Sequence, residues 1–305
     1  MPFSLGQTFG KRGVVWKLFE GTGTLGDMTR IGIIGGGNIG EALLSGLIAD
    51  GVKAKDIIVA DRSEDRLETL NNKYSVVTTE EGREAAEEVD VLFNCVKPDV
   101  TVGVFEDISD VLDNNEANTI AVSVAAGVTI AAMEGVLPAG TAVARVMPNT
   151  PMLVGKGTCA IAGGRFAEKD QLELVQDLLS KVGTAVVVQE KDIDAVTAVS
   201  GSGPAYLFLV AEAMIDAGVN LGLKRDLAET LAVSTVEGAA AMMVKGQEEG
   251  GDDPAALRAK VSSPGGTTSA ATRALEENGI RTAFFRAMQA CKDRSIELGK
   301  DDSDS

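Results

Sequence analysis

The sequence predicts an α/β domain followed by an all-helical domain. Short apolar segments alternate with helical patterns from Arg30 to about Val188, and after Lys191 the strand-like segments stop. Apolar strands that alternate with helices are typical of a parallel sheet covered by helices on both faces. The 305 residues are enough for two domains of ordinary size, at ~100–200 residues each.

In the first domain, strands are expected at residues 30–36, 56–61, 89–96, 119–127, 141–148, 159–164 and 184–189. Helices are expected there at 38–51, 63–74, 104–113, from Val128 onward and at 170–182. In the second domain, three- and four-residue spacing of apolar residues predicts helices at 205–218, 225–246, 253–261, 266–278 and 281–299. Gly218, Gly246 and Gly279 stand where helix C-caps are expected.

These patterns divide the chain into an N-terminal extension, 1–27, an α/β domain, 28–188, a helical domain, 189–300, and an acidic tail, 301–305. We expect the Gly-rich extension to be disordered, either as a natural flexible arm or as an upstream start ahead of a true start at Met28. It does not resemble a secretory signal, because a lysine interrupts its apolar run VVW. The many Ala and Gly residues of the second domain suit close packing of its helices against a second subunit.

Charge and composition exclude several classes of function. A formal net charge of −17 argues against nucleic acid and anionic membranes as partners, since a phosphate backbone requires a positive surface. No run approaches the ~18 consecutive apolar residues of a membrane span. The absence of histidine removes Ser-His-Asp and Cys-His catalysis and His-ligated metals. Cys95, Cys159 and Cys291 form no CxxC pair, so we expect a cytoplasmic protein without a disulfide or a metal site.

Gly35, Gly37 and Gly40 form a GxGxxG pattern between a predicted strand and a predicted helix. The first glycine permits a tight turn, the second lets the backbone approach a diphosphate, and the third allows close helix packing. The positive end of the helix dipole favours the anion. This predicts a Rossmann-type dinucleotide-binding domain, and the alternative is a tight turn in an α/β protein that binds no nucleotide.

The segment Asp61–Arg62–Ser63 at the end of the second strand bears on the cofactor. An acid at this place usually holds the ribose diol of NAD, whereas an adjacent Arg-Ser pair can hold the 2′-phosphate of NADP. The residues therefore leave NADPH and NADH both open.

Further motifs lie at strand ends and in the second domain. CVKP, Cys95–Pro98, and SVAAG, Ser123–Gly127, end two strands at the carboxyl edge, where ligands of open α/β sheets bind. The alternative for the lysine of CVKP is an exposed loop cation. RVMPNTP, Arg145–Pro151, and SGSGPAY, Ser200–Tyr206, can both be structural junctions. VSSPGGTTSAA, Val261–Ala271, is typical of a ligand loop, because hydroxyl residues and glycines lead directly into a predicted helix.

Together, in this order and at this spacing, the motifs resemble those of pyrroline-5-carboxylate reductase, a family that makes proline. The resemblance covers about residues 30–299, and SGSGPAY and SSPGGTT are its most specific parts. It implies NADPH- or NADH-dependent hydride transfer to the C=N bond of a small-molecule substrate, pyrroline-5-carboxylate. It also implies a homodimer, or a higher assembly of dimers, formed through the helical domain, with a substrate site between the domains.

The resemblance and the strand-end residues assign roles along the chain. The expected cofactor-binding residues are Gly35, Gly37, Asn38, Ile39, Gly40, Asp61, Arg62, Ser63, Cys95, Val96, Lys97, Pro98, Ser123, Ala125 and Ala126. The expected substrate-binding residues are Ser263, Gly266, Thr267, Thr268 and, as a weaker candidate, Glu190. One departure is Gly82, which stands where the family usually has an asparagine that touches the adenosine half of the cofactor.

With no histidine in the chain, Thr268 is the expected catalytic hydroxyl. A threonine is a weak acid, so we expect it to orient the ring nitrogen, while the proton comes from solvent or is already on a bound iminium. Tyr206 is a second candidate, although a core position is the simpler interpretation. Two alternatives are weighed: a β-hydroxyacid-dehydrogenase-like enzyme, which needs a lysine that SGSGPAYLFLVAEAM lacks, and a non-catalytic dinucleotide sensor, against which the intact SSPGGTT argues.

Overall fold

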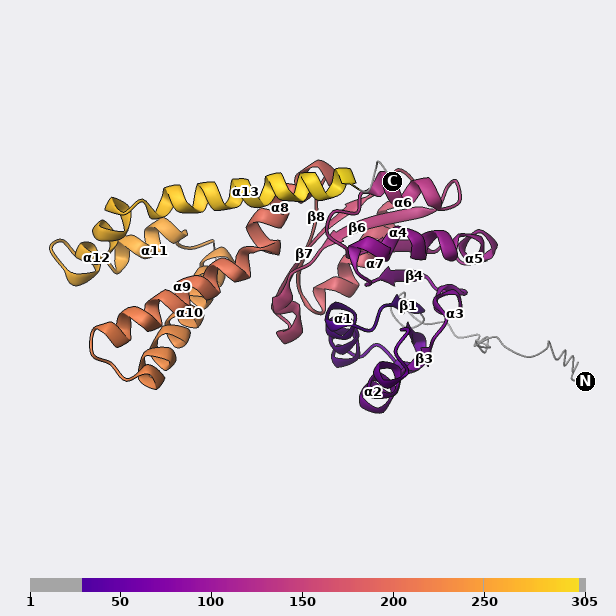
Figure 1. Cartoon of the computed structure of the whole chain (residues 1–305), viewed down its shortest axis with the longest axis horizontal. Helices are drawn as coiled ribbons and strands as arrows, with labels where there is room; N and C mark the ends of the chain where they lie inside the picture. The colour runs from indigo at the N-terminus through magenta and orange to yellow at the C-terminus, as the bar shows by residue number, and fades with distance from the viewer. Residues whose placement is uncertain (1–28, 249, 302–305) are drawn as a thin grey trace, which may run out of the picture. The chain divides into compact units, whose positions relative to one another are not determined.

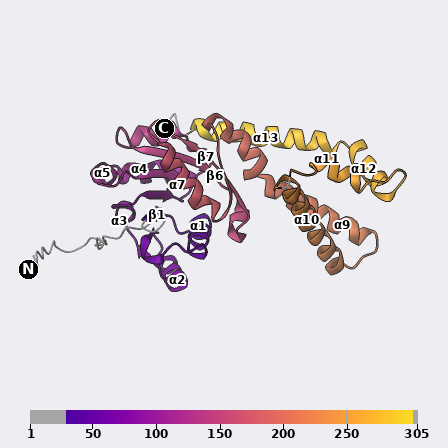
Figure 2. The same cartoon turned by 180° about the vertical axis from the view of Figure 1, so that it is seen from behind.

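The computed structural model describes residues 29–248 and 250–301, which form two compact units (Figure 1; Figure 2 shows the reverse view). One unit extends to Ile193 and includes the chain again from Ile296, and the other is Asp194–Ser295. A sheet with helices followed by helices alone confirms the predicted fold class. The domain limits 28–188 and 189–300 stay predictions. The predicted extension 1–27 lies outside the described residues, as does the predicted tail beyond Asp301.

The first unit is built on an eight-stranded sheet with the order β3-β2-β1-β4-β5-β6-β7-β8. Its strands are β1 (Ile31–Ile34), β2 (Ile57–Ala60), β3 (Val77–Thr79), β4 (Val91–Asn94), β5 (Ile120–Ser123), β6 (Ala142–Met147), β7 (Gly157–Gly163) and β8 (Gly183–Val187). Every residue of β1, β2, β4 and β5 is buried, which explains why these segments are apolar throughout instead of alternating. Because β1 to β6 are parallel, the loops after β1, β4 and β5 leave the same edge of the sheet.

Helices and short helical turns connect these strands, and the last of them, η3, follows β8. They are α1 (Asn38–Ala49), η1 (Ala54–Asp56), α2 (Glu64–Tyr74), α3 (Gly82–Ala86), α4 (Pro98–Asp107), α5 (Ser109–Asn114), α6 (Ile130–Val136), η2 (Thr150–Val154), α7 (Lys169–Ser180) and η3 (Glu190–Asp192). The apolar side chains of α1 and α7, such as Leu43, Leu47 and Val175, join the strands in one core.

Two features of this sheet differ from the sequence prediction. The segment Val77–Ala86 was not predicted to be regular, yet it contains the edge strand β3 and the short helix α3. In addition, β7 is antiparallel to β6 and β8 is parallel to β7, so the last two strands run against the other six. The segments that form β7 and β8 were predicted to be strands, but the hydrophobic pattern does not encode strand direction.

Among the residues that the structure describes, the second unit contains only helices and the loops that connect them. After α8 (Ile193–Val196) and a π-helical turn (Thr197–Gly201) come α9 (Gly203–Asn220), α10 (Arg225–Glu248), α11 (Pro254–Lys260), α12 (Thr267–Glu277) and α13 (Ile280–Asp301). Both views show α9 and α10 side by side (Figure 1 and Figure 2). The predicted helices of this half are therefore confirmed.

Of the three glycines predicted to cap helices, one does so and two do not. Gly279 follows α12 with φ +75°, the left-handed conformation that a C-terminal glycine supplies. Gly218 and Gly246 instead lie inside α9 and α10. A Cβ on Gly218 would lie 3.1 Å from Cβ of Ala228, and one on Gly246 would lie 2.5 Å from the carbonyl oxygen of Asp252. These two glycines were mispredicted because close packing, not helix termination, requires them.

Candidate active site

The Gly-rich loop between β1 and α1 is held by contacts that only glycine permits. Gly35 has φ +99°, and a Cβ on it would lie 2.9 Å from the carbonyl carbon of Cys95. A Cβ on Gly40 would lie 2.0 Å from the carbonyl oxygen of Gly35. The loop, the end of β4 and the first turn of α1 thus pack backbone against backbone.

Gly37 faces open space, unlike its two partners in the motif. No described atom lies within 4 Å of a Cβ built on it. Gly37 is the N-cap of α1, and within the described residues no side chain caps this helix, which leaves its first amides to a ligand. An open approach to free amides at a helix N-terminus suits a diphosphate. The loop therefore fits the dinucleotide that the glycine pattern predicts.

The residues after β2 are already engaged with this loop. Asp61 accepts hydrogen bonds from the Gly36 amide at Oδ2, 2.8 Å, and from the Ser63 amide at Oδ1, 3.0 Å. The hydroxyl oxygen of Ser63 accepts from the Arg66 amide at 3.3 Å and caps α2. Arg62 is exposed. Asp61 and Ser63 thus have structural partners, and their predicted contacts with a ribose or a phosphate stay predictions.

CVKP links β4 to α4 at the carboxyl edge of the sheet. Lys97 is the N-cap of α4 and Pro98 is its first residue, where the missing amide hydrogen costs nothing. Lys97 is exposed and Val96 is half-buried. Burial raises the pKa of the Cys95 thiol to about 12, so this cysteine is no nucleophile at neutral pH. CVKP can therefore line a ligand, but its cysteine supplies no nucleophile.

SVAAG follows β5 next to CVKP in the sheet order. Ser123 is fully buried, and its hydroxyl oxygen accepts from the Ala125 amide at 3.2 Å. Gly127 has φ +86°, and a Cβ on it would lie 3.3 Å from Cβ of Leu298. The last turns of α13 therefore pack on this loop and fix its end.

Glu190 lies in the first unit, in the turn η3. Its Oε1 accepts from the Ile130 amide at 2.7 Å and lies 3.6 Å from Nη1 of Arg145. The side chain of Arg145 is only 6% exposed, so Glu190 supplies a counter-charge to a buried cation. Asn149 belongs to the same motif as Arg145, RVMPNTP, and its Oδ1 accepts a hydrogen bond from the Thr158 amide at 2.8 Å. RVMPNTP therefore has a structural task, while substrate binding by Glu190 stays a prediction.

The loop SSPGGTT joins α11 to α12 and is held by its own hydrogen bonds. The carbonyl oxygen of Ser263 accepts from the Gly266 amide at 3.0 Å and from the Ser269 hydroxyl at 2.6 Å. The Ser262 hydroxyl donates to the Arg258 carbonyl at 2.8 Å. Gly265 has φ +69°, and a Cβ on Gly266 would lie 2.4 Å from Ser263 Oγ.

The remaining hydroxyls of this loop differ from these in that they do not take part in holding the loop together. Within the described residues, Ser263, Thr267 and Thr268 have no hydrogen bond through their side chains. Gly266 is the N-cap of α12, and no described side chain caps that helix. Three hydroxyls and the first amides of α12 are therefore left to a ligand, and these belong to the residues predicted to bind substrate.

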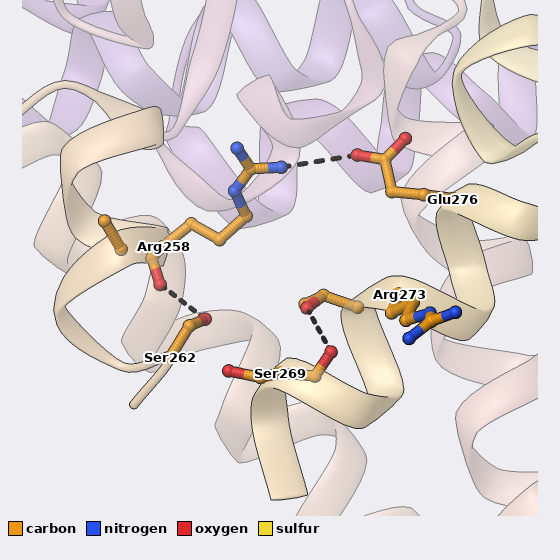
Figure 3. A pocket seen from close by; sticks show the side chains of 7 residues that line it. Arg258, Ser262, Ser269, Arg273 and Glu276 are labelled. Carbon is orange, nitrogen blue, oxygen red and sulfur yellow. Dashed lines mark hydrogen bonds and ion pairs between the residues drawn. The ribbon is translucent and has the colours of Figure 1, made fainter. Parts of the chain in front are cut away.

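A hollow of about 320 Å³ lies beside this loop, between α11 and α12 (Figure 3). Across it Arg258 points toward Glu276, with Nη1 and Oε1 3.4 Å apart, while Arg273 points away. Its Ser262, Ser269 and Thr272 hydroxyls all donate to backbone carbonyls. None of the predicted substrate residues lines the hollow, and its polar groups already have partners, so we do not assign the substrate to it.

Sequence reasoning missed a charged group next to the cofactor loop. Glu41 in the first turn of α1 pairs with Arg66 and, at 2.8 Å, with Lys73, and it accepts from the Tyr74 hydroxyl at 3.0 Å. The partners lie 25 to 33 positions away in the sequence, so no local spacing could have revealed the group.

Tyr206, the second candidate for the catalytic hydroxyl, donates a hydrogen bond to the Ala198 carbonyl at 3.1 Å.

Fold and loops together define a dinucleotide-binding oxidoreductase with a helical second domain. Residues 30–127 match a family model described as NADP oxidoreductase coenzyme F420-dependent, and residues 190–298 match one described as pyrroline-5-carboxylate reductase dimerisation. A pyrroline-5-carboxylate reductase of Corynebacterium melassecola is 58% identical over 90% of this chain and 100% of the relative. One from Mycobacterium tuberculosis is 47% identical over 89% of this chain and 97% of the relative. The chain belongs to the pyrroline-5-carboxylate reductase family.

Solved structures agree with this assignment. A pyrroline-5-carboxylate reductase from Coxiella burnetii has a TM-score of 0.84 and 37% identity, covering 89% of this chain and 98% of that one. The Plasmodium falciparum pyrroline carboxylate reductase, solved with NADP bound, has a TM-score of 0.77 and 28% identity, covering 90% of this chain and 99% of that one. The family that the motifs resemble is thereby confirmed.

Proposed function

We propose that this protein reduces the C=N bond of pyrroline-5-carboxylate to give proline, with NADPH or NADH as the reductant. The observation that carries the proposal is the full-length match to a pyrroline-5-carboxylate reductase at 58% identity, in a chain with both an open dinucleotide loop and an uncapped SSPGGTT helix start. When bound, the nicotinamide supplies the hydride that adds to the imine carbon. The ring nitrogen takes a proton from solvent or binds already protonated.

In this reaction, the residues of the chain bind the cofactor and the substrate and orient them toward each other. Around Gly37, the free amides of α1 hold the cofactor diphosphate, and CVKP and SVAAG line its ribose and nicotinamide. The free amides at Thr267 and Thr268 hold the substrate carboxylate. The Thr268 hydroxyl hydrogen-bonds the ring nitrogen and fixes its orientation for hydride addition, an effect of positioning more than of acidity. This mechanism needs no histidine.

The helical domain also supports self-association. Two segments, Glu190–Asn220 and Arg225–Gln247, are long and apolar enough to cross a membrane by length and composition alone. Both lie within the match to the dimerisation model, and Phe208 and Leu209 are 68% and 66% exposed. We assign these apolar faces to the contact in a homodimer, or in a higher assembly of dimers. Three free cysteines suit a reducing cytoplasm.

The experiment that tests this function is the loss of cofactor absorbance on addition of pyrroline-5-carboxylate, with NADPH and NADH in parallel. Thr268→Ala should lower kcat by about 10- to 100-fold, since a hydrogen bond to a charged group contributes ~1.5–3 kcal/mol, while cofactor Kd stays unchanged. Thr268→Ser keeps the hydroxyl and should retain most activity. Thr69→Ala, which removes an exposed helix threonine in α2, is the matched control. No absorbance loss with either cofactor refutes the function, and normal kcat in Thr268→Ala removes Thr268 from the mechanism.

A further inference from the structure

The Gly36 peptide is held by side chains at both of its polar groups. Its amide donates to Asp61 Oδ2 at 2.8 Å, and its carbonyl oxygen accepts from Arg66 Nε at 2.5 Å. Gly36 lies between Gly35 and Gly37 and is not one of the motif glycines. A Cβ on it would lie 2.7 Å from Cδ1 of Leu70, so the loop also packs closely on α2. The loop that faces the cofactor diphosphate is therefore fixed from behind.

Arg66 joins this loop to the first turn of α1. One end of its guanidinium donates to Gly36 and the other pairs with Glu41. Glu41 is further held by Lys73 Nζ at 2.8 Å and by the Tyr74 hydroxyl at 3.0 Å. Side chains of Arg66 and Glu41 are 26% and 20% exposed, so their charges are only partly screened by water. One arginine thus connects the loop, α1 and α2.

The ion pair between Arg66 and Glu41 also affects the electrostatics at the N-terminus of α1. Glu41 stands in the first turn of the helix whose N-terminus receives the diphosphate, where an unpaired carboxylate would repel that ligand. The ammonium of Lys73 and the guanidinium of Arg66 lower the pKa of Glu41 to about 2, so Glu41 is a carboxylate at neutral pH. Its compensation by cations is therefore a permanent requirement of the site.

We propose that Arg66 is a positioning residue that sets cofactor affinity without touching the cofactor. It holds the Gly36 carbonyl, and with it the direction of the neighbouring loop, and it neutralises Glu41 beside the anion site. A loop that is ordered before binding loses less conformational entropy on binding, which favours affinity. This inference rests on the proposed use of NADPH or NADH at this loop.

The test measures Kd for NADPH and for NADH by titration of cofactor fluorescence, together with kcat at saturating cofactor. Arg66→Gln should raise both Kd values by about tenfold, equal to 1.4 kcal/mol, and by similar factors for the two cofactors. The kcat should stay within about twofold of wild type. Arg66→Lys cannot make both of these bonds, so its Kd values should lie between those of the wild type and Arg66→Gln. The matched control is Arg165→Gln, because Arg165 pairs with Glu134 through Nε at 2.8 Å in the same unit.

Comparison of the two cofactors separates positioning from direct contact. If Arg66→Gln weakens NADPH alone, Arg66 grips the 2′-phosphate and the proposal is wrong. Unchanged Kd values, or a fall in kcat at unchanged Kd, also overturn it. Should Arg66→Gln lose the fold by circular dichroism, Arg66→Lys provides the test, since it keeps a cation beside Glu41 but cannot also hold the Gly36 carbonyl, and it should raise both Kd values about two- to fivefold. Wild-type protein that binds neither cofactor would instead refute the proposed function.

Discussion

Replacement of Glu41 by glutamine tests the ion cluster behind the cofactor loop through its dependence on pH. In the folded protein, Lys73 and Arg66 lower the pKa of Glu41 from 4.5 to about 2. A depressed carboxyl pKa stabilises the fold above pH 4.5, and this contribution is lost as the pH falls from about 4.5 to about 2. The difference between the two values corresponds to at most about 3.5 kcal/mol, at ~1.4 kcal/mol per pKa unit. Because the side chain keeps some contact with water, we expect about 1–3 kcal/mol.

The assay is urea unfolding of wild type and Glu41→Gln at pH 7, 4 and 3. Protein concentration is held constant, because subunit association contributes to measured stability. The difference in unfolding free energy between the two proteins should be largest at pH 7 and should shrink at pH 4 and again at pH 3. Asp110→Asn is the control: Arg83 lowers the pKa of that carboxyl, but it is far more exposed, and its effect should be smaller. A difference that is constant from pH 7 to pH 3 would refute the assignment of the cluster to a charged Glu41.

Three further substitutions test the loop and the helical domain. Gly40→Ala would place a Cβ 2.0 Å from the Gly35 carbonyl oxygen, so the loop must move. The Kd for NADPH, measured by fluorescence titration, should therefore rise at least about tenfold, which corresponds to ~1.4 kcal/mol. In Gly37→Ala the added Cβ meets no described atom within 4 Å, so the melting temperature should match that of the wild type. Cofactor binding should nevertheless weaken, because the methyl group occupies the open approach to the loop. Wild-type affinity for the cofactor would show that no ligand binds close to Gly37. Phe208→Glu should yield a smaller species in sedimentation velocity, whereas Phe166→Glu, also at an exposed phenylalanine, should not; equal sedimentation of both would exclude α9 from the subunit contact.

The regular elements could be predicted because each depends on a local pattern. Buried parallel strands such as Ile31–Ile34 and Val91–Asn94 are continuously apolar, and the helices of the second unit keep their spacing over several turns. Val77–Ala86 was missed because its short strand is only half-buried and its helix spans just one or two turns. The reversal of β7 and β8 depends on how the chain crosses the sheet, which no single segment encodes.

Within the site, contacts between sequence neighbours could be predicted from local motifs, whereas contacts between distant segments could not. The contacts that fix SSPGGTT span at most six positions, as between Ser269 and Ser263. The Arg66 contacts with Gly36 and Glu41 span 30 and 25 positions. Gly218 and Gly246 belong to the second kind as well, because the atoms they make room for lie on the following helix or loop.

The two loops that are proposed to bind anions are also held in different ways. The loop between β1 and α1 is held by side chains of the next βα unit, namely Asp61 after β2 and Arg66 in α2. The SSPGGTT loop takes its shape from bonds between its own backbone and hydroxyls, with Ser262, Ser269 and Thr272 committed and Ser263, Thr267 and Thr268 uncommitted within the described residues. Substitutions in β2 or α2 should therefore disturb the loop between β1 and α1, whereas SSPGGTT depends on bonds between residues of its own segment. In the proposed function, the cofactor would therefore bind a loop that depends on tertiary packing, and the substrate anion would bind a loop that is held by local bonds.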